Sequence, residues 1–378
     1  MRIYFDNAAT TAIDPEVIQE MVQVMEGSYG NPSSIHAHGR QVRTLIEKAR
    51  RTVANFLHVS PAEIFFTSGG TEADNTAIRR GIIDHNITHA ISSPLEHHAV
   101  LHSLEDMEKR GEVKLTLLNV DKKGKVDLQQ LEELLENSPR TFVSLMHANN
   151  EIGTLLDIER VSEICQKYNA LFHCDTVQTM GHYALDLSKI HVDFVTCAAH
   201  KLHGPKGVGF LYVNHNVKIK PLLYGGAQER NMRGGTENVY GIIGLAKALE
   251  IAFLQMDEHH KHIQNLKSYM IQQINDNIPG CHFNGETDPE KSLYTVLNVC
   301  FPENGLGDML LFNLDIEGVS ASGGSACSSG SNIGSHVLNA IGAEADRPSI
   351  RFSFSKYNTT EEIDIVVAKL KEYCLQKA

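Results

Sequence analysis

A lysine at the end of an apolar run has the clearest chemical potential in this sequence. The run 192–199 is mainly apolar and stops at His200-Lys201, and a second apolar run begins at Val208 after a turn with glycine and proline. A strand buried on both faces has such a sequence. It would bring Lys201 to the edge of a sheet, where desolvation favours the free amine that forms imines. The competing interpretation is a surface lysine in a hairpin turn, so the rest of the chain must decide.

Polar groups follow four other expected strands, 64–67, 89–92, 141–146 and 171–174. In a parallel sheet, ligands bind beyond the carboxyl ends of the strands. The residues that follow these four strands are Ser68-Gly69-Gly70-Thr71, His97, Asn149-Asn150, and Asp175 with Gln178.

Each of these signals is weak alone, because Gly-Gly before a helix is also an ordinary tight turn. One ligand would account for all of these polar groups at once. Pyridoxal phosphate has an aldehyde for Lys201, a ring nitrogen whose protonated form needs a carboxylate such as Asp175, and a phosphate for Gly70-Thr71 and the start of the helix expected at 72–84. A buried aspartate is costly unless a cation faces it. We therefore predict a pyridoxal 5'-phosphate site at this edge of the sheet.

The elements that must position these residues alternate between strand and helix up to residue 199. This order indicates an α/β fold with a mainly parallel sheet covered by helices on both faces. A long helical stretch, 239–277, departs from the alternation, and shorter strands and helices follow it. We predict a large cofactor-binding domain, 14–255, and a small α+β domain formed by 1–13 and 256–378 that carries the loop with Cys327.

Composition limits the partners. The chain has 378 residues, with 34 Lys plus Arg against 46 Asp plus Glu and a net charge of −12. That balance argues against direct nucleic-acid binding. No apolar run approaches the roughly 18 residues of a membrane span, and an acidic residue, Asp6, comes too early for a signal peptide. We expect a soluble, cytoplasmic protein with no membrane partner.

The cysteines and histidines do not form a metal-site pattern. Seven cysteines show no C-x-x-C pair, and Cys165, Cys197 and Cys300 fit core positions. The histidines at 259–262 lie in a polar helix without further ligands at metal-site spacing. We predict no metal site.

Several longer motifs in the sequence are more specific. They are Phe5-Asp-Asn-Ala-Ala-Thr-Thr11, Thr67-Ser-Gly-Gly-Thr-Glu-Ala-Asp-Asn75, Glu96-His-His-Ala-Val-Leu101, Asn149-Asn-Glu-Ile-Gly-Thr154, His200-Lys201-x-x-Gly-Pro-Lys-Gly207, Gln228-Glu-Arg-x-x-Arg-x-Gly-Thr-Glu-Asn238 and Ser325-Ala-Cys327-Ser-Ser. As a set they resemble one family, the cysteine desulfurases of the NifS/IscS-like branch of the class V aminotransferases. The resemblance implies a homodimeric fold-type-I pyridoxal-phosphate transferase that converts L-cysteine to L-alanine. It also implies an enzyme persulfide whose sulfur passes to an acceptor or an iron–sulfur scaffold protein, for cluster assembly or tRNA thiolation.

The resemblance also implies a role for each matching residue. Lys201 would bond to the cofactor aldehyde carbon, Asp175 would pair with the ring nitrogen, Gln178 would bind the phenolic oxygen, and His97 would stack on the ring and act as an acid or base. Gly70, Thr71 and His200 would hold the phosphate, together with Thr236 of the second subunit. Asn150 and Arg351 would bind the substrate carboxylate, and Cys327 would accept the sulfur.

Two of these roles also follow from the residues themselves. Cys327 lies among small residues, 320–331, in a loop that would expose its nucleophilic thiol. Arg351 lies within an apolar run, where it would be an uncompensated buried charge unless an anion meets it. One position departs from the family, because Ala198 stands where serine is common.

Three alternatives stay open at this point. A selenocysteine lyase shares the fold and the cofactor, and in another class V aminotransferase Cys327 would be incidental. A metal-binding or regulatory protein would instead use the histidines.

Overall fold

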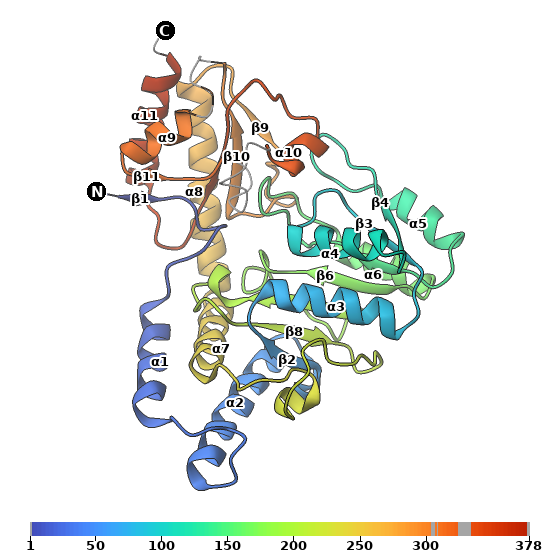
Figure 1. Cartoon of the computed structure of the whole chain (residues 1–378). Helices are drawn as coiled ribbons and strands as arrows, with labels where there is room; N and C mark the ends of the chain where they lie inside the picture. The colour runs from blue at the N-terminus through green and yellow to red at the C-terminus, as the bar shows by residue number, and fades with distance from the viewer. Residues whose placement is uncertain (1, 304–306, 308, 324–333, 376–378) are drawn as a thin grey trace.

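A seven-stranded sheet forms the centre of the larger part of the molecule (Figure 1). The computed structural model describes residues 2–303, 307, 309–323 and 334–375. The strand order is β2-β8-β7-β6-β5-β3-β4, and only β8 runs antiparallel to its neighbours. The prediction of a mainly parallel α/β sheet is confirmed. The strands are β2 (Ile64–Thr67), β3 (His89–Ser92), β4 (Lys114–Leu117), β5 (Phe142–Ser144), β6 (Leu171–Asp175), β7 (Phe194–Ala198) and β8 (Gly209–Val213).

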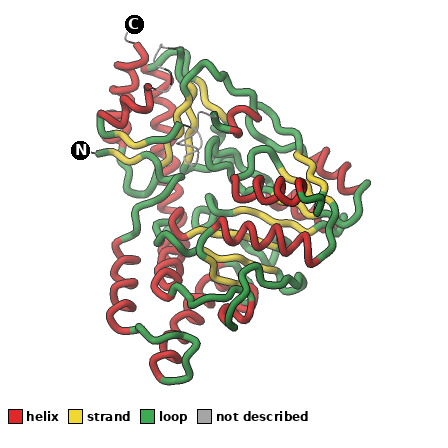
Figure 2. Tube along the Cα trace, in the orientation of Figure 1, coloured by secondary structure: helices red, strands yellow, loops and turns green. Residues whose placement is uncertain are grey.

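Helices cover both faces of this sheet, as the red segments around the yellow strands show in Figure 2. Successive strand residues point to opposite faces. Phe194 therefore packs with the cluster beneath α3 and α4, while Val195 joins the cluster of α2, α6 and α7. The helices of this part are α1 (Pro15–Gly27), α2 (Ala37–Phe56), α3 (Gly70–Asp84), α4 (His98–Lys109), α5 (Leu128–Glu136), α6 (Ile158–Lys167) and α7 (Val239–Leu254).

A second hydrophobic cluster lies around a smaller sheet near the C-terminus. This antiparallel sheet has the order β12-β10-β9, and its core includes Met270, Val299 and Phe352. The residues before α1 belong to it, since Phe5 is in the same cluster and β1 (Ile3–Tyr4) pairs in parallel with β11 (Val319–Ser320). The domain boundaries themselves stay a prediction. The other elements are α8 (Met256–Asn277), β9 (His282–Asn284), β10 (Val296–Cys300), α9 (Met309–Ile316), α10 (His336–Ala340), β12 (Ser349–Ser353) and α11 (Thr360–Leu375).

The predicted helical stretch 239–277 is two helices, α7 and α8, which meet at Gln255 with a bend of 75°. α7 is apolar on nearly all sides because it packs between α1 and α2. Among the described residues, no single helix is long and apolar enough to cross a membrane. α7 and α8 meet that test of length and composition only as a bent pair.

A buried ion pair fixes the segment that follows β8. The Glu229 carboxylate accepts hydrogen bonds from Arg50 Nη1 and Nη2, both at 2.7 Å, and from the Phe66 amide at 2.8 Å. Glu229, Arg230 and Asn231 all have positive φ, which is strained for residues with a Cβ. The ion pair therefore holds a strained turn against α2 and β2.

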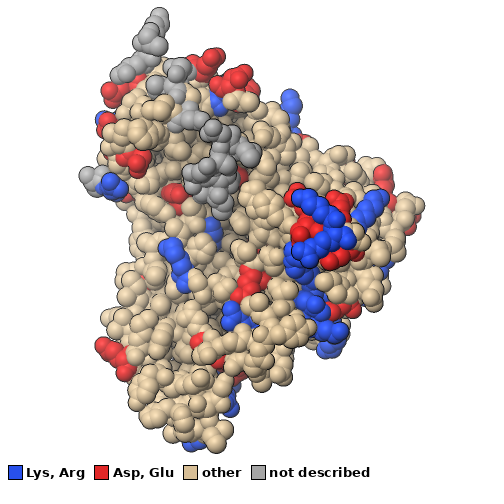
Figure 3. Space-filling model, viewed as in Figure 1, with Lys and Arg blue, Asp and Glu red and all other residues tan. Residues whose placement is uncertain are grey.

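Arg50→Met should destabilise the fold by about 3–5 kcal/mol, because it leaves Glu229 buried without its cation. Urea unfolding would measure this loss. The matched control is Arg79→Met, which breaks a partly exposed pair with Asp106 (2.8 Å) and should destabilise the fold far less, because solvent screens that pair. Figure 3 shows blue and red side chains gathered over α3 and α4. Equal losses in the two variants would contradict the role given to Arg50.

Candidate active site

A cavity of about 390 Å³ opens at the carboxyl ends of β6 and β7, beneath the smaller sheet. Most of the residues singled out in the sequence line it, although they come from both parts of the molecule. They are Gly70, Thr71, His97, Asn150, Asp175, Gln178, His200, Lys201 and Arg351. Their individual roles stay predictions.

Lys201 lies in the short 3-10 turn Ala199–Lys201, directly after β7. Its Nζ donates hydrogen bonds to the carbonyl oxygens of Ala8 (2.5 Å) and Ala9 (2.8 Å). These carbonyls belong to the segment between β1 and α1. The N-terminal segment therefore helps to place the lysine amine in the cavity.

Two buried carboxyl groups face the same cavity. Asp175 ends β6 and accepts hydrogen bonds from the Val177 amide (2.8 Å) and Thr196 Oγ1 (3.4 Å). Burial, with the charge of Asp74 as the next cause, raises the pKa of Asp175 to about 7. Burial also raises the pKa of Asp74, on α3, to about 7. Because neither ion is well solvated, a cation bound beside them would be strongly favoured.

A histidine near Asp74 does not supply that cation. His173 Nε2 lies 3.4 Å from Asp74 Oδ1, which is within ion-pair distance. Burial, however, lowers the pKa of His173 to about 4, so the ring is neutral at neutral pH. In agreement with a neutral ring, neither His173 Nε2 nor Asp74 Oδ1 has a hydrogen-bond partner among the described residues.

The start of α3 offers backbone donors to an anion. The helix begins at Gly70, two residues earlier than predicted, and its N-cap Gly69 makes no side-chain capping bond. Gly69 has a φ of +151°, and a Cβ on Gly70 would lie 2.8 Å from Val177 Cγ2. His200 lies in the same wall, where its Nδ1 is 3.2 Å from Thr10 Oγ1. The free N–H groups and positive end of the helix suit a phosphate.

Arg351, on β12, is 1% exposed. Nη1 donates to the Asn150 carbonyl oxygen (2.8 Å) and Nη2 to Asp6 Oδ1 (2.8 Å), whereas Nε has no partner. An unpaired buried N–H is costly, and the Nε–Nη2 edge matches a carboxylate. Gln178 Nε2, nearby, donates to the Ala8 carbonyl oxygen (3.1 Å). The geometry supports binding of a carboxylate at Arg351.

Two residues that the sequence analysis assigned to the site, Thr236 and Cys327, are not among the residues that line this cavity. Thr236 is exposed and lines a separate pocket, and its role in a second subunit stays a prediction. Cys327 lies outside the described residues. Sequence reasoning missed Asp74 and the carbonyls of Ala8 and Ala9. Asp74 could have been found from its place one helical turn after Gly70, but nothing in the sequence marks backbone carbonyls as ligands.

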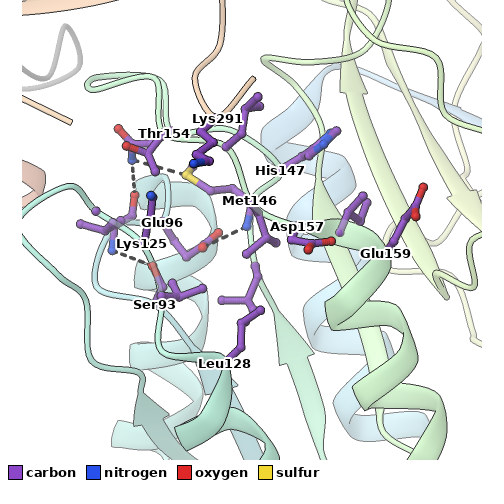
Figure 4. A pocket seen from close by; sticks show the side chains of 18 of the residues that line it. Ser93, Glu96, Lys125, Leu128, Met146, His147, Thr154, Asp157, Glu159 and Lys291 are labelled. Atoms are coloured by element: carbon purple, nitrogen blue, oxygen red, sulfur yellow. Dashed lines mark hydrogen bonds between the residues drawn. The ribbon is translucent and has the colours of Figure 1, made fainter. Parts of the chain in front are cut away.

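A larger cavity, of about 590 Å³, lies behind Glu96 and Met146 (Figure 4). Glu96 Oε1 accepts from the Met146 amide (3.0 Å), and burial raises its pKa well above the usual value. Of the lysines at its rim, Lys125 pairs with Glu286 and Lys291 with Asp288. Of the polar groups found at the strand ends, only Asn149 lines this cavity, and no described residue with a predicted cofactor or substrate role does, so we place the chemistry in the smaller one.

The smaller cavity fits pyridoxal phosphate. It has an amine for the aldehyde, two buried carboxyl groups whose pKa values are raised by burial, and a helix start without a side-chain cap for the phosphate. Lys201, Asp175 and the first residues of α3 would hold the three ends of the cofactor.

Asp74→Asn should reduce the loss of stability of the ligand-free protein between about pH 5 and pH 8. An unfolded aspartate titrates near 3.9, while the folded pKa is about 7. Unfolding therefore releases the proton across this window, and stability falls as pH rises from about 4 to about 7. Each pKa unit corresponds to about 1.4 kcal/mol. The difference in unfolding free energy between pH 5 and pH 8, called the pH gap below, should therefore be smaller in Asp74→Asn than in wild type by a few kcal/mol.

Urea unfolding at pH 5 and at pH 8 would measure the pH gap. Asp315→Asn, at an exposed position, serves as the control and should leave the pH gap unchanged. An Asp74→Asn protein with the wild-type gap would show that this carboxyl is not destabilised by burial.

Comparisons with known proteins agree with the geometry. Residues 3–366 match the model of the aminotransferase class-V family. The chain is 42% identical to the cysteine desulfurase IscS of Dictyoglomus turgidum, covering 98% of this chain and 93% of the relative. It is 42% identical to that of Methanosarcina thermophila, covering 98% and 91%.

Solved structures give the same result. A NifS-like protein has a TM-score of 0.90 at 40% identity, covering 98% of this chain and 99% of that one. A structure of SspA in complex with cysteine has a TM-score of 0.81 at 30% identity, covering 95% and 100%. One cavity of this chain contains a lysine, a buried carboxylate and a helix start that can bind an anion. The sequence and structure matches agree with that site, and the chain belongs to the class V aminotransferase family and, within it, to the cysteine desulfurases.

Proposed function

We propose that this enzyme is a pyridoxal-phosphate-dependent cysteine desulfurase that converts L-cysteine to L-alanine and keeps the sulfur as a persulfide on Cys327. The main support for this proposal is that Lys201, Asp175 and Arg351 line the same cavity. These three groups match the reactive carbon of the cofactor, its ring nitrogen and the carboxylate of an amino acid. Relatives named cysteine desulfurase support L-cysteine as the substrate, as does the cysteine complex of SspA.

The chain supplies binding, orientation and proton transfer. When bound, pyridoxal phosphate withdraws electrons from the Cα and Cβ atoms of the amino acid joined to it. Asp175 keeps a proton on the ring nitrogen, and the charge it neutralises lowers the cost of its own burial. Arg351 and Asn150 hold the substrate carboxylate. Lys201 Nζ moves the Cα proton, and the Cys327 thiolate attacks the substrate sulfur.

His97 is placed to donate a hydrogen bond. Its Nδ1 accepts from the Ala99 amide (3.1 Å), because an amide can only donate, and this leaves the ring proton on Nε2. Burial first, then the charge of Lys201, lowers its pKa to about 4. A neutral ring with Nε2–H fits stacking and hydrogen-bond donation better than the acid or base role predicted for it.

We also propose that the enzyme acts as a homodimer in which Thr236 reaches the phosphate site of the second subunit. Thr236 is exposed, and Tyr224, in the same segment, is 76% exposed. The Arg50–Glu229 pair holds this segment on the surface. A sulfur acceptor or iron–sulfur scaffold protein as partner, and a cytoplasmic location, stay predictions.

The proposed function is tested by mass spectrometry of the purified enzyme after addition of L-cysteine. Wild type should form L-alanine and gain one sulfur atom on Cys327. Cys327→Ala should keep the cofactor and its spectral response to L-cysteine but lose sulfur release, because the acceptor thiol is gone. Lys201→Ala should lose both, because the cofactor cannot bond to an alanine side chain.

Other results would redirect the assignment. Exchange of the amino group with a 2-oxo acid, without sulfur release, would indicate an aminotransferase. Selenium release from selenocysteine with no turnover of L-cysteine would indicate a selenocysteine lyase. Unchanged sulfur release in Cys327→Ala would remove Cys327 from the mechanism.

Ala198→Ser should tighten cofactor binding. Ala198 lines the cavity, and its Cβ lies 3.7 Å from the place of a Cβ on Gly70, at the expected phosphate site. A serine hydroxyl could donate to the phosphate, and hydrogen bonds to charged groups contribute about 1.5–3 kcal/mol. The dissociation constant for pyridoxal phosphate should fall about tenfold, as measured by absorbance titration of the cofactor-free enzyme. Ala198→Gly adds no donor and should not tighten binding; weaker binding in the serine variant would contradict the prediction.

A further inference from the structure

Arg351 has an acidic partner that does not line the active-site cavity. Arg351 Nη2 donates to Asp6 Oδ1 at 2.8 Å, and Arg351 lines the cavity whereas Asp6 is not among the lining residues. The Arg351 side chain is 1% exposed and that of Asp6 is 19% exposed. Within the part of the chain that the structure describes, Asp6 is the carboxylate at ion-pair distance from this guanidinium. A substrate carboxylate would therefore approach a cation that already has an anionic partner.

Backbone pairing holds Asp6 beside Arg351. Asp6 forms a β-bridge with Ser353, and Ser322 forms one with Arg351. In the second bridge the Arg351 amide donates to the Ser322 carbonyl oxygen at 2.7 Å, and Ser322 Oγ donates to Asp6 Oδ1 at 2.8 Å. One oxygen of Asp6 thus accepts from a neutral hydroxyl and from the guanidinium. The ion pair is built into the edge of the small sheet and needs no bound substrate to form.

The guanidinium keeps donors for a ligand despite this pairing. Nη1 of Arg351 donates to the Asn150 carbonyl oxygen at 2.8 Å, and Nε has no hydrogen-bond partner among the described residues. A guanidinium has five N–H groups in a planar fork, so donors remain on the Nε–Nη2 edge. Hydrogen-bond geometry for a carboxylate is therefore present, while the positive charge behind it is offset by Asp6.

Two anions that bond to one guanidinium repel each other. Unit charges a few ångströms apart at an effective dielectric constant of about 20 interact strongly enough to change a binding constant tenfold or more. Without Asp6, a buried arginine would instead be an uncompensated cation, which binds any small anion that reaches it. Asp6 therefore decides how tightly Arg351 holds a carboxylate, although it is not among the residues that line the cavity.

We propose that Asp6 is a positioning residue that acts through Arg351 and keeps the affinity of the cavity for carboxylates low. The ion pair orients the guanidinium for a carboxylate, and its negative member prevents product and simple anions from occupying the site. This inference rests on the proposed function, since it takes an amino acid as substrate and L-alanine as product. An amino acid gains further affinity from the bond of its amino group to the cofactor, which a simple carboxylate lacks.

The test uses three ligands, each titrated calorimetrically into the holoenzyme. They are L-alanine, propionate, which lacks the amino group, and ethylamine, which lacks the carboxylate. Asp6→Asn keeps an oxygen that can accept from Arg351 and Ser322 but removes the charge. The dissociation constants for propionate and L-alanine should both fall about tenfold or more, whereas that for ethylamine should stay within about threefold of wild type. Because the gain is equal in substrate and product, KM for L-cysteine should fall without a rise in kcat.

Three further variants separate charge from structure. Asp6→Glu keeps the charge and should bind propionate within about threefold of wild type. Asp6→Ser removes the charge from a smaller side chain and should tighten propionate binding, so the test does not depend on the folding of one variant. The matched control is Asp14→Asn, which removes a carboxylate from a buried pair with Lys356 away from the cavity and still caps α1. It should leave all three dissociation constants within about twofold of wild type.

Propionate that binds to Asp6→Asn and Asp6→Ser no more tightly than to wild type would overturn the assignment. An equal gain for ethylamine would do the same, because the effect would then not concern the carboxylate. If wild type forms no alanine from L-cysteine, the proposed function fails, while the propionate titrations still decide the role of Asp6. If wild type forms alanine and the titrations do not differ, only the inference fails.

Discussion

The burial of charge at the carboxyl edge of the sheet is the constraint on which the rest of the site depends. Asp175 and Asp74 sit where water cannot solvate them, and the neutral His173 gives no compensation. Burial of these carboxyl groups destabilises the ligand-free protein. In return, a buried carboxylate would bind a cationic ring nitrogen far more tightly than a solvated carboxylate could. The other groups follow from that anchor. Once the ring is fixed over Asp175, its aldehyde and phosphate ends must meet Lys201 and the start of α3.

The site is shared between two hydrophobic cores. The large sheet supplies the cofactor-facing groups, while β12 supplies Arg351 and the N-terminal segment supplies the carbonyls of Ala8 and Ala9. Asp6 joins these contributions, because its carboxylate accepts from both Arg351 and Ser322. The substrate carboxylate would enter an environment in which Arg351 already has one anionic partner. Selectivity for amino acids then depends on the free Nε edge, not on the net charge of the arginine.

Much of this could be predicted from the sequence. Continuous apolar strands alternate with amphipathic helices, and this pattern fixes which residues stand at the carboxyl edge; Gly70, Asp175 and Lys201 were found in this way. Contacts made by backbone atoms or by lone pairs were not, because no side-chain type marks them. The carbonyls of Ala8 and Ala9 and the bond from the Ala99 amide to His97 Nδ1 belong to this group. The start of α3 was placed two residues late, because a glycine N-cap has no side chain to signal it.

The pairing of β1 with β11 and of Asp6 with Arg351 has a consequence for biosynthesis. These contacts join the first ten residues to positions more than 300 residues later. Contacts so distant in sequence form only after most of the chain has left the ribosome. The large sheet can fold while synthesis continues, and Lys201 can meet the carbonyls of Ala8 and Ala9, 193 and 192 residues away, before the C-terminal region is made. Arg351 takes its place beside Asp6 only when the chain is nearly complete. The side of the cavity that would bind the substrate carboxylate is therefore the last to form.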